Sequence, residues 1–295
     1  MFDYRYHALS LAAVLFALAL GVLIGVAIGD TNLVSSAKNG IVHNLESEVG
    51  NTRKQAGQLQ DKLSVEESFT AALYPLAVHE LLAGRSIGLV FLGGSSDQVD
   101  GLVRNAVAQA GANLQSVIAI REPLDLEGID QEAAGTHYAT LSGSVSLVER
   151  FGELAGRQLV SGGQLVDREL LSRVRASLMS AFDGQLGRLE GLVVMRAEPS
   201  GMSAAQTEAA AAFESGLLAG VSAVGVPTVG VELTGTEPSQ VPWYKSKGIS
   251  SVDDLDALAG QAALAYALAG DPGAFGVKSS ADSLLPSSTP ASSAP

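Results

Sequence analysis

Hydrophobic residues form one long, almost uninterrupted run near the start of the chain. Residues 8–28 span 21 positions, and Ser10 carries the only polar side chain among them. At about 1.5 Å of rise per helical residue, this run covers about 30 Å, the thickness of a bilayer's hydrocarbon core. The pattern predicts a single transmembrane helix, with residues 1–30 as the anchor. The alternative is a signal peptide cleaved near Ala27 and Gly29, but the apolar run of a signal peptide usually has only about 7 to 15 residues.

The charges that flank this run indicate its orientation. Arg5 and the terminal amine precede it, whereas Asp30 and then Lys38 follow it. Because positive charge tends to stay on the cytoplasmic side, we expect a cytoplasmic N-terminus and an extracytoplasmic main domain.

Three glycines repeat at four-residue spacing in the predicted membrane helix, namely Gly21, Gly25 and Gly29. This spacing places them on one helix face, where a second backbone can approach closely. They are therefore candidates for dimerisation. Glycine is also common in membrane helices that do not dimerise, so the spacing leaves both interpretations open.

After the membrane run, apolar side chains recur in alternating steps of three and four, with charged and amide side chains between them. Such a heptad pattern predicts a short coiled coil of about three heptads, which is weakened at Thr52 and Ala56. We expect a dimeric stalk over residues 31–75, ended or kinked at Tyr74-Pro75. The alternative is a single amphipathic helix that packs against the globular part. The expected dimer contacts are Val42, Leu45, Val49, Leu59 and Leu63.

The remainder of the chain alternates short apolar runs with helical patterns. The runs show no polar alternation, which is typical of strands buried on both faces of a parallel sheet. Residues 84–277 are therefore predicted to form a Rossmann-like α/β domain. The expected strands are residues 87–92, 116–120, 191–195 and 226–231, and the expected helices are residues 99–110, 145–160, 168–182 and 204–218.

Three carboxylates precede an alanine-rich helix that is expected to end at residue 268. Asp253, Asp254 and Asp256 follow Ser251, which is a good N-cap residue, and the positive end of a helix dipole favours nearby carboxylates. We interpret the group as helix capping, with binding of a cation or a basic partner as the alternative. Residues 278–295 are rich in Ser, Pro and Ala and are predicted to be a disordered tail.

Composition narrows the range of functions. Lys and Arg total 18 against 31 Asp and Glu, so the net charge is −13, which argues against nucleic acid as a partner because phosphate binding needs clustered cations. The chain has no cysteine, which excludes thiolate metal sites and cysteine nucleophiles.

No catalytic motif is complete. His79-Glu80 begins like a zinc-protease helix, but Ala83 stands where the second histidine is required. The phosphate loop and the nucleophile elbow are both missing, so we predict no catalytic residue and no enzyme activity, and no group of residues forms a strong metal site. The strand-end loops near Gly93 and Glu198 are the default place for an enzyme site in an α/β fold. Histidine and methionine, which suit copper, are scattered at His7, His43, His79, His137, Met179, Met195 and Met202.

Both ends of the chain resemble a known family. The start reads Arg5-Tyr6-His7-Ala8-Leu9-Ser10-Leu11-Ala12-Ala13-Val14 and continues into Gly21-Val22 and Ile24-Gly25. The end reads Gly248 to Asp256, followed by Gly260, Gly270 and Leu284-Leu285-Pro286. Together they resemble the actinobacterial MctB copper-transport family, which includes the cell-separation protein SteB. The chain departs from the family's pattern at Ser251, where threonine is usual, and at Ala274-Phe275, where a His-Tyr pair is common.

The resemblance implies copper homeostasis or efflux, with placement in the outer membrane of the cell envelope. Copper is implied as a ligand by the resemblance alone, and the family brings no catalytic residue. The SteB branch implies instead a scaffold that works with a membrane-associated companion protein in cell division and in control of wall hydrolysis. We expect a homodimer that acts as a tethered module and not as a monomeric pore.

Overall fold

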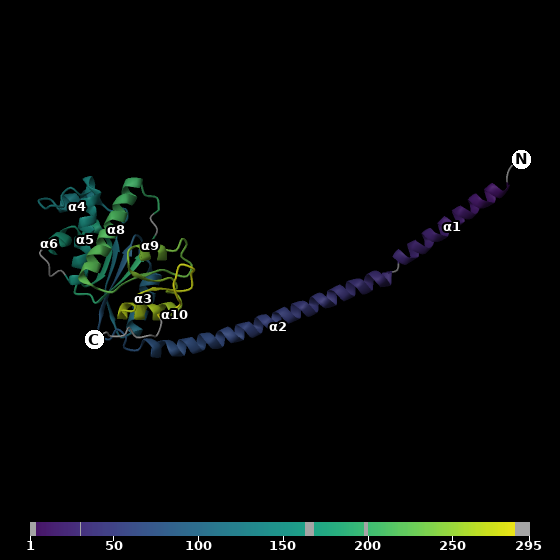
Figure 1. Cartoon of the computed structure of the whole chain (residues 1–295), viewed down its shortest axis with the longest axis horizontal. Helices are drawn as coiled ribbons and strands as arrows, with labels where there is room; N and C mark the ends of the chain where they lie inside the picture. The colour runs from purple at the N-terminus through teal and green to yellow at the C-terminus, as the bar shows by residue number, and fades with distance from the viewer. Residues whose placement is uncertain (1–3, 30, 163–167, 198–199, 287–295) are drawn as a thin grey trace. The chain divides into compact units, whose positions relative to one another are not determined.

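The computed structural model describes residues 4–29, 31–162, 168–197 and 200–286 (Figure 1). The chain divides into two compact units, Met1–Ser68 and Phe69–Pro295. We call the second unit the head domain.

The first unit consists of helix α1 (Tyr4–Ile28) and most of helix α2 (Thr31–Val78). In the part of the chain that the structure describes, α1 is the single helix long and apolar enough to cross a membrane, as the hydrophobic run predicted. Helix α2 does not end at Tyr74-Pro75 but continues to Val78. Tyr74 and Val78 are buried in the core of the head domain, so packing there holds the helix together beyond the proline.

Among the described residues, one seven-stranded sheet forms the centre of the head domain, in the order β3-β2-β1-β4-β5-β6-β7. Every strand runs parallel to its neighbours except β3, which pairs antiparallel with β2 at one edge. The α/β class is confirmed, and the sheet is mixed. The strands are β1 (Ser86–Leu92), β2 (Asn113–Ile120), β3 (Met179–Gly184), β4 (Gly191–Arg196), β5 (Thr228–Val231), β6 (Ser250–Val252) and β7 (Ala274–Phe275).

Helices cover both faces of the sheet. On one face lie α3 (Asp97–Gln109), α10 (Leu258–Ala269) and the last turns of α2. On the other lie α4 (Leu126–Glu132), α5 (Val145–Ser161), α6 (Arg168–Arg173), α7 (Arg175–Leu178), α8 (Ala204–Val224) and α9 (Val241–Ser246). Between α4 and α5 the chain makes a short 3-10 turn, Leu141–Gly143.

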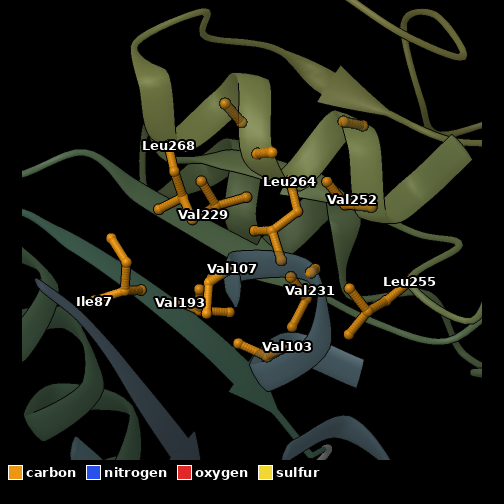
Figure 2. Packing of buried hydrophobic residues seen from close by; sticks show 14 of the residues in the cluster. Ile87, Val103, Val107, Val193, Val229, Val231, Val252, Leu255, Leu264 and Leu268 are labelled. Carbon is orange, nitrogen blue, oxygen red and sulfur yellow. The ribbon is translucent and has the colours of Figure 1, made fainter. Parts of the chain in front are cut away.

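The continuous apolar runs follow from this layering. In β1, Leu89 and Phe91 join the core beneath α3 and α10, while Val90 and Leu92 join the core on the opposite face. Figure 2 shows the first of these cores, where side chains of α3 and α10 meet those of the strands. Residues facing both ways are buried, so no polar alternation appears in the strand sequence.

Three sequence expectations are corrected by the structure. Residues 168–182 are not one helix: α6 and α7 give way to the edge strand β3 at Met179. The segment around Ser251 holds a short strand, β6, and α10 begins only at Leu258. Residues 278–286 were predicted to be disordered, but the structure describes them packed on the head domain. Lys278 fixes the start of this segment, because its backbone N–H binds the buried carboxylate of Asp253 and its ammonium group binds the buried carboxylate of Glu232. Residues 287–295 lie outside the described residues.

Candidate functional site

The sheet reverses its winding between β1 and β4. From β1 the chain moves to β2 on one side, and from β4 it moves to β5 on the other. Ligands of open α/β sheets bind at such a switch point, outside the carboxyl ends of the strands. Gly93 directly follows β1 with φ +96°, and a Cβ there would lie 3.2 Å from Oε2 of Glu122 and 3.3 Å from Cβ of Ala197. Glycine therefore permits a close approach of three segments at this point.

Arg196, the last residue of β4, organises the switch point. Its Nε donates to Glu214 Oε1 at 2.9 Å, and its Nη1 donates to Gln240 Oε1 at 2.7 Å. The guanidinium carbon lies 4.7 Å from the ring centre of Trp243, in cation–π geometry. These contacts tie the end of β4 to α8 and to the start of α9. We call the group of Glu122, Arg196, Glu214, Gln240, Trp243 and Tyr244 the strand-end cluster.

Tyr244 locks this cluster to β5. Its hydroxyl accepts a hydrogen bond from the Arg196 backbone N–H at 3.0 Å and donates one to the Val231 carbonyl at 3.1 Å. Its ring covers Gly230 so closely that a Cβ there would lie 2.3 Å from a ring carbon. Complete burial strongly raises the pKa of Tyr244, so the hydroxyl stays protonated as the hydrogen-bond donor.

Two carboxyl groups meet in the cluster. Glu214 is 1% exposed, and its Oε2 accepts no hydrogen bond from a described donor. The charge of Glu214 acts on the nearby carboxyl group of Glu122. Burial, and then the charge of Glu214, raise the pKa of Glu122 to about 7; burial also raises the pKa of Glu214, against the pull of Arg196. Near neutral pH, Glu122 is therefore close to the pH at which it titrates and can take up and release a proton.

We expect Glu122→Gln to stabilise the head domain at pH 8 by about 1 to 2 kcal/mol. This free energy is smaller than the full pKa shift would give, because Glu122 is partly exposed and water screens its charge. The folded carboxyl has the higher pKa, so the wild type loses stability as pH rises from about 4.5, the ordinary pKa, to about 7. The amide does not titrate in this range, so it removes that loss. Urea unfolding from pH 5 to 8, followed by fluorescence of Trp243, the only tryptophan in the chain, measures how the free energy of unfolding changes with pH in the wild type and in the variant.

Glu127→Gln, an exposed change in the first turn of α4, is the matched control for this experiment. It should leave the pH dependence as in the wild type. Equal slopes for Glu122→Gln and the wild type would contradict the raised pKa of Glu122.

A second polar group lies at the ends of β5 and β7. Glu232 directly follows β5, is 1% exposed, and accepts hydrogen bonds from the Lys278 ammonium group at 2.7 Å and the Ser239 hydroxyl at 2.8 Å. Its other oxygen accepts from the backbone N–H of Gln240, the residue whose side chain binds Arg196. Gln240 therefore joins this group to the strand-end cluster.

The predicted capping role of the three aspartates is wrong. The N-cap of α10 is Ala257, which has no side chain able to cap, and Ser251 is buried in β6. Asp253 accepts hydrogen bonds from the backbone of residues 277 and 278, and Asp256 accepts from the backbone and hydroxyl of Thr234. Asp253 and Asp256 thus hold different segments, and neither caps α10.

Asp254 is buried, and neither of its oxygens has a hydrogen-bond partner among the described residues. Burial, and then the charge of Asp253, raise its pKa to about 6. Burial alone would raise the pKa of Asp256 as well, but hydrogen bonds from Thr234 hold it below its ordinary range.

The dimerisation candidates lie on the two long helices, except Gly29, which directly follows α1. Beyond the neighbouring turns of the helix itself, no described atom lies within 4 Å of a Cβ built on Gly21 or Gly25, whereas a Cβ on Gly29 would lie 2.9 Å from the Gly25 carbonyl oxygen of α1. The stalk candidates on α2 are exposed by 44% to 62%: Val42, Leu45, Val49, Leu59 and Leu63.

Metal-ligating side chains remain dispersed in the described ranges, where no three of His, Asp or Glu come close enough to hold a metal ion. His79 lies 4.0 Å from Glu80 on an exposed turn, and His137 stacks edge-on against Tyr138. Ala274 and Phe275 are buried in β7.

Comparison with known proteins identifies the family. The model of a family described as "Copper transport outer membrane protein, MctB" matches residues 1–286. This chain belongs to the MctB family. Copper transporter MctB of Mycobacterium bovis, and the proteins of the same name from two strains of Mycobacterium tuberculosis, are each 30% identical to it over 122 residues. The aligned part is 41% of this chain and 38% of the length of those relatives. The resemblance inferred from the two ends is thereby confirmed.

The sequence contains a signal for the strand-end cluster, but none of the motifs considered in the sequence analysis contains it. Arg196 closes a buried apolar strand and Glu232 directly follows another, which places both charged side chains at the carboxyl edge of the sheet. Of the two loop positions expected at this edge, Gly93 contacts Glu122, and Glu198 lies outside the described residues.

Proposed function

We propose that this MctB-family protein is a single-pass envelope protein that acts in copper homeostasis or efflux as a dimeric tethered module. The observation that carries the proposal is the family match over residues 1–286, together with the copper transporters among the relatives. The apolar helix α1 supports membrane attachment. In this proposal the N-terminus is cytoplasmic, the head domain is extracytoplasmic, and the outer membrane is the membrane named by the family's description.

A tethered module suits the chain better than a monomeric pore. Over residues 8–28, the side chains of α1 are apolar except for Ser10, and a single such helix offers a cation no polar path through a bilayer. Movement of copper would take several copies or a second protein. We assign the protein no catalytic reaction and no nucleic-acid partner, since its charge is −13.

The exposed seam of α2 supports a dimer. Leu45 and Leu59, which are 55% and 62% exposed, stand in the heptad positions that two parallel helices would cover mutually. Each fully covered leucine contributes roughly 1.5 to 3 kcal/mol relative to an exposed one. The glycines Gly21 and Gly25 on α1 leave room for a second helix backbone in the same dimer.

Single-cysteine variants test the dimer, because the natural chain has no cysteine that could interfere. Leu45→Cys and Leu59→Cys in the full-length membrane protein should give same-residue disulfide dimers under mild oxidation. Lys54→Cys, which lies on the opposite side of the heptad, should remain largely monomeric on a non-reducing gel. Equal crosslinking at all three positions would contradict a specific seam.

Cellular copper content tests the copper role. A copper-sensitive host that produces the full chain should accumulate less copper than a host with an empty vector, as measured by mass spectrometry of washed cells. The double change Leu45→Lys and Leu59→Lys should abolish the effect, while Lys54→Gln should preserve it. Unchanged copper content with the wild-type chain would overturn the copper role.

A SteB-like scaffold in cell separation is the second candidate. It is favoured by a row of large apolar side chains on α2 that lie bare in the described structure: Val65, Phe69, Leu73 and Leu76, exposed by 47% to 73%. Such a row suits a companion protein. Copurification of a membrane-associated partner with the wild type, lost in Phe69→Ser, together with chained cells in the Phe69→Ser strain, would favour this candidate over copper transport.

A further inference from the structure

A cavity lies beside the edge of the sheet, apart from the strand-end cluster. Its volume of about 380 Å³ falls within the range of ligand-binding pockets, roughly 300 to 1,000 Å³. Strands β2 and β3 and helices α5, α7 and α8 contribute its walls. The apolar lining includes Ile118, Ile120, Leu159, Leu178, Met179 and Phe182.

Gln158 on α5 brings an unsatisfied amide to this cavity. It is 4% exposed and lines the cavity, and neither its Oε1 nor its Nε2 has a hydrogen-bond partner within the described ranges. A buried amide without partners destabilises the fold, and such groups are rare in native proteins. A ligand that offers both a donor and an acceptor would satisfy it.

Arg175 adds a single charge at the rim. It is exposed, its guanidinium carbon lies 3.9 Å from the ring centre of Phe182, and it is the one charged side chain among the described residues that line the cavity. In a protein with a net charge of −13, a cation without a competing carboxylate selects for an anion.

We propose that this cavity binds an acyl carboxylate that carries a second hydrogen-bonding group, such as a hydroxy fatty acid. The carboxylate pairs with Arg175, the hydrocarbon chain covers the apolar walls, and the hydroxyl pairs with both ends of the Gln158 amide. A plain fatty acid leaves Gln158 unsatisfied, and a neutral alcohol leaves Arg175 without an anion. This proposal is independent of the role in copper homeostasis.

Titration calorimetry tests the proposal on the full chain in lipid nanodiscs, with empty nanodiscs as the blank. The probes are decanoate and hydroxydecanoates with the hydroxyl at the β- or the ω-carbon. At least one hydroxydecanoate should bind about threefold to tenfold more tightly than decanoate, as expected for one net hydrogen bond. Gln158→Leu should remove that preference, and Arg175→Gln should weaken all the acids that bind by about tenfold.

Stability provides an independent readout. Gln158→Leu should raise the melting temperature of the ligand-free protein, because an apolar side chain of similar size replaces an unpartnered amide. Gln261→Leu is the matched control. Gln261 is also 4% exposed, but its amide is bonded to Asn105 and to the Leu255 carbonyl, so this change should lower the melting temperature and leave binding unchanged.

Three results would each overturn the proposal: failure of all three acids to bind, equal binding of decanoate and the hydroxydecanoates, or binding that neither Gln158→Leu nor Arg175→Gln alters.

Discussion

Replacing Gly156 with alanine is expected to destabilise the head domain by about 3 kcal/mol. Gly156 lies on α5 where it crosses α8, and a Cβ there would lie 2.0 Å from the Leu217 carbonyl oxygen. Backbone atoms of a packed helix cannot move aside as a flexible side chain can, so α5 and α8 would have to separate. Overpacking in a core typically costs about 1 to 3 kcal/mol of stability. We expect a loss at the upper end of this range, because the added Cβ would lie so close to a backbone oxygen.

The effect should be reciprocal across the two helices. A Cβ on Gly216 of α8 would lie 1.9 Å from the Glu149 carbonyl oxygen of α5, so Gly216→Ala should cost as much as Gly156→Ala. Urea unfolding followed by Trp243 fluorescence measures both changes.

Gly101→Ala is the control for these two variants. Gly101 is exposed on α3, with no atom of the described structure within 4 Å of an added Cβ, and alanine should stabilise this helix by up to about 1 kcal/mol. A loss below about 1 kcal/mol for Gly156→Ala would contradict the close helix contact.

These glycines show how far a spacing rule can be applied. Glycines four residues apart, Gly152 with Gly156 and Gly216 with Gly220, bring α5 and α8 together inside the head domain. The same spacing on α1 predicts a contact between two chains, and on that helix the described structure provides no partner. The spacing signals close backbone approach in both places, but it cannot say whether the second helix belongs to the same chain.

The layers of the fold were predictable because burial on both faces leaves a clear trace in the sequence. Strands β1, β2, β4 and β5 all lie within or near the expected apolar runs. Strands β3, β6 and β7 were not recognised, for a physical reason. β3 is an edge strand whose side chains are mostly exposed, β6 has only three residues, two of them serine, and β7 has only two residues, so none of them shows a strand's hydrophobic pattern.

The candidate site was less predictable than the fold. Glu122, Arg196 and Glu214 are far apart in sequence, and only the strand order brings them to one switch point. A sequence pattern can place a charge after a strand, but it cannot determine which strands become neighbours. The raised pKa of Glu122 depends on that pairing, and no local motif encodes it.

Lys278→Met is expected to destabilise the head domain by about 3 kcal/mol. The change leaves Glu232, which is 1% exposed, without its cationic partner, and breaking a buried ion pair from one side costs about 3 to 5 kcal/mol. The lower end applies because Ser239 and the Gln240 backbone still donate to the carboxylate. Adding Glu232→Gln should recover much of the loss, because the buried charge is then removed as well.

An exposed ion pair supplies the control for the buried one. Lys245 binds Asp282 at 2.7 Å, the same distance as Lys278 to Glu232, but the two side chains are 40% and 65% exposed. Lys245→Met should therefore cost no more than about 1 kcal/mol, since water already solvates both charges. Equal losses for Lys278→Met and Lys245→Met would contradict a C-terminal segment held by a buried charge. If Lys278→Met costs more stability than Lys245→Met, and Glu232→Gln restores it, then the buried ion pair of Lys278 holds a segment that the sequence predicted to be disordered.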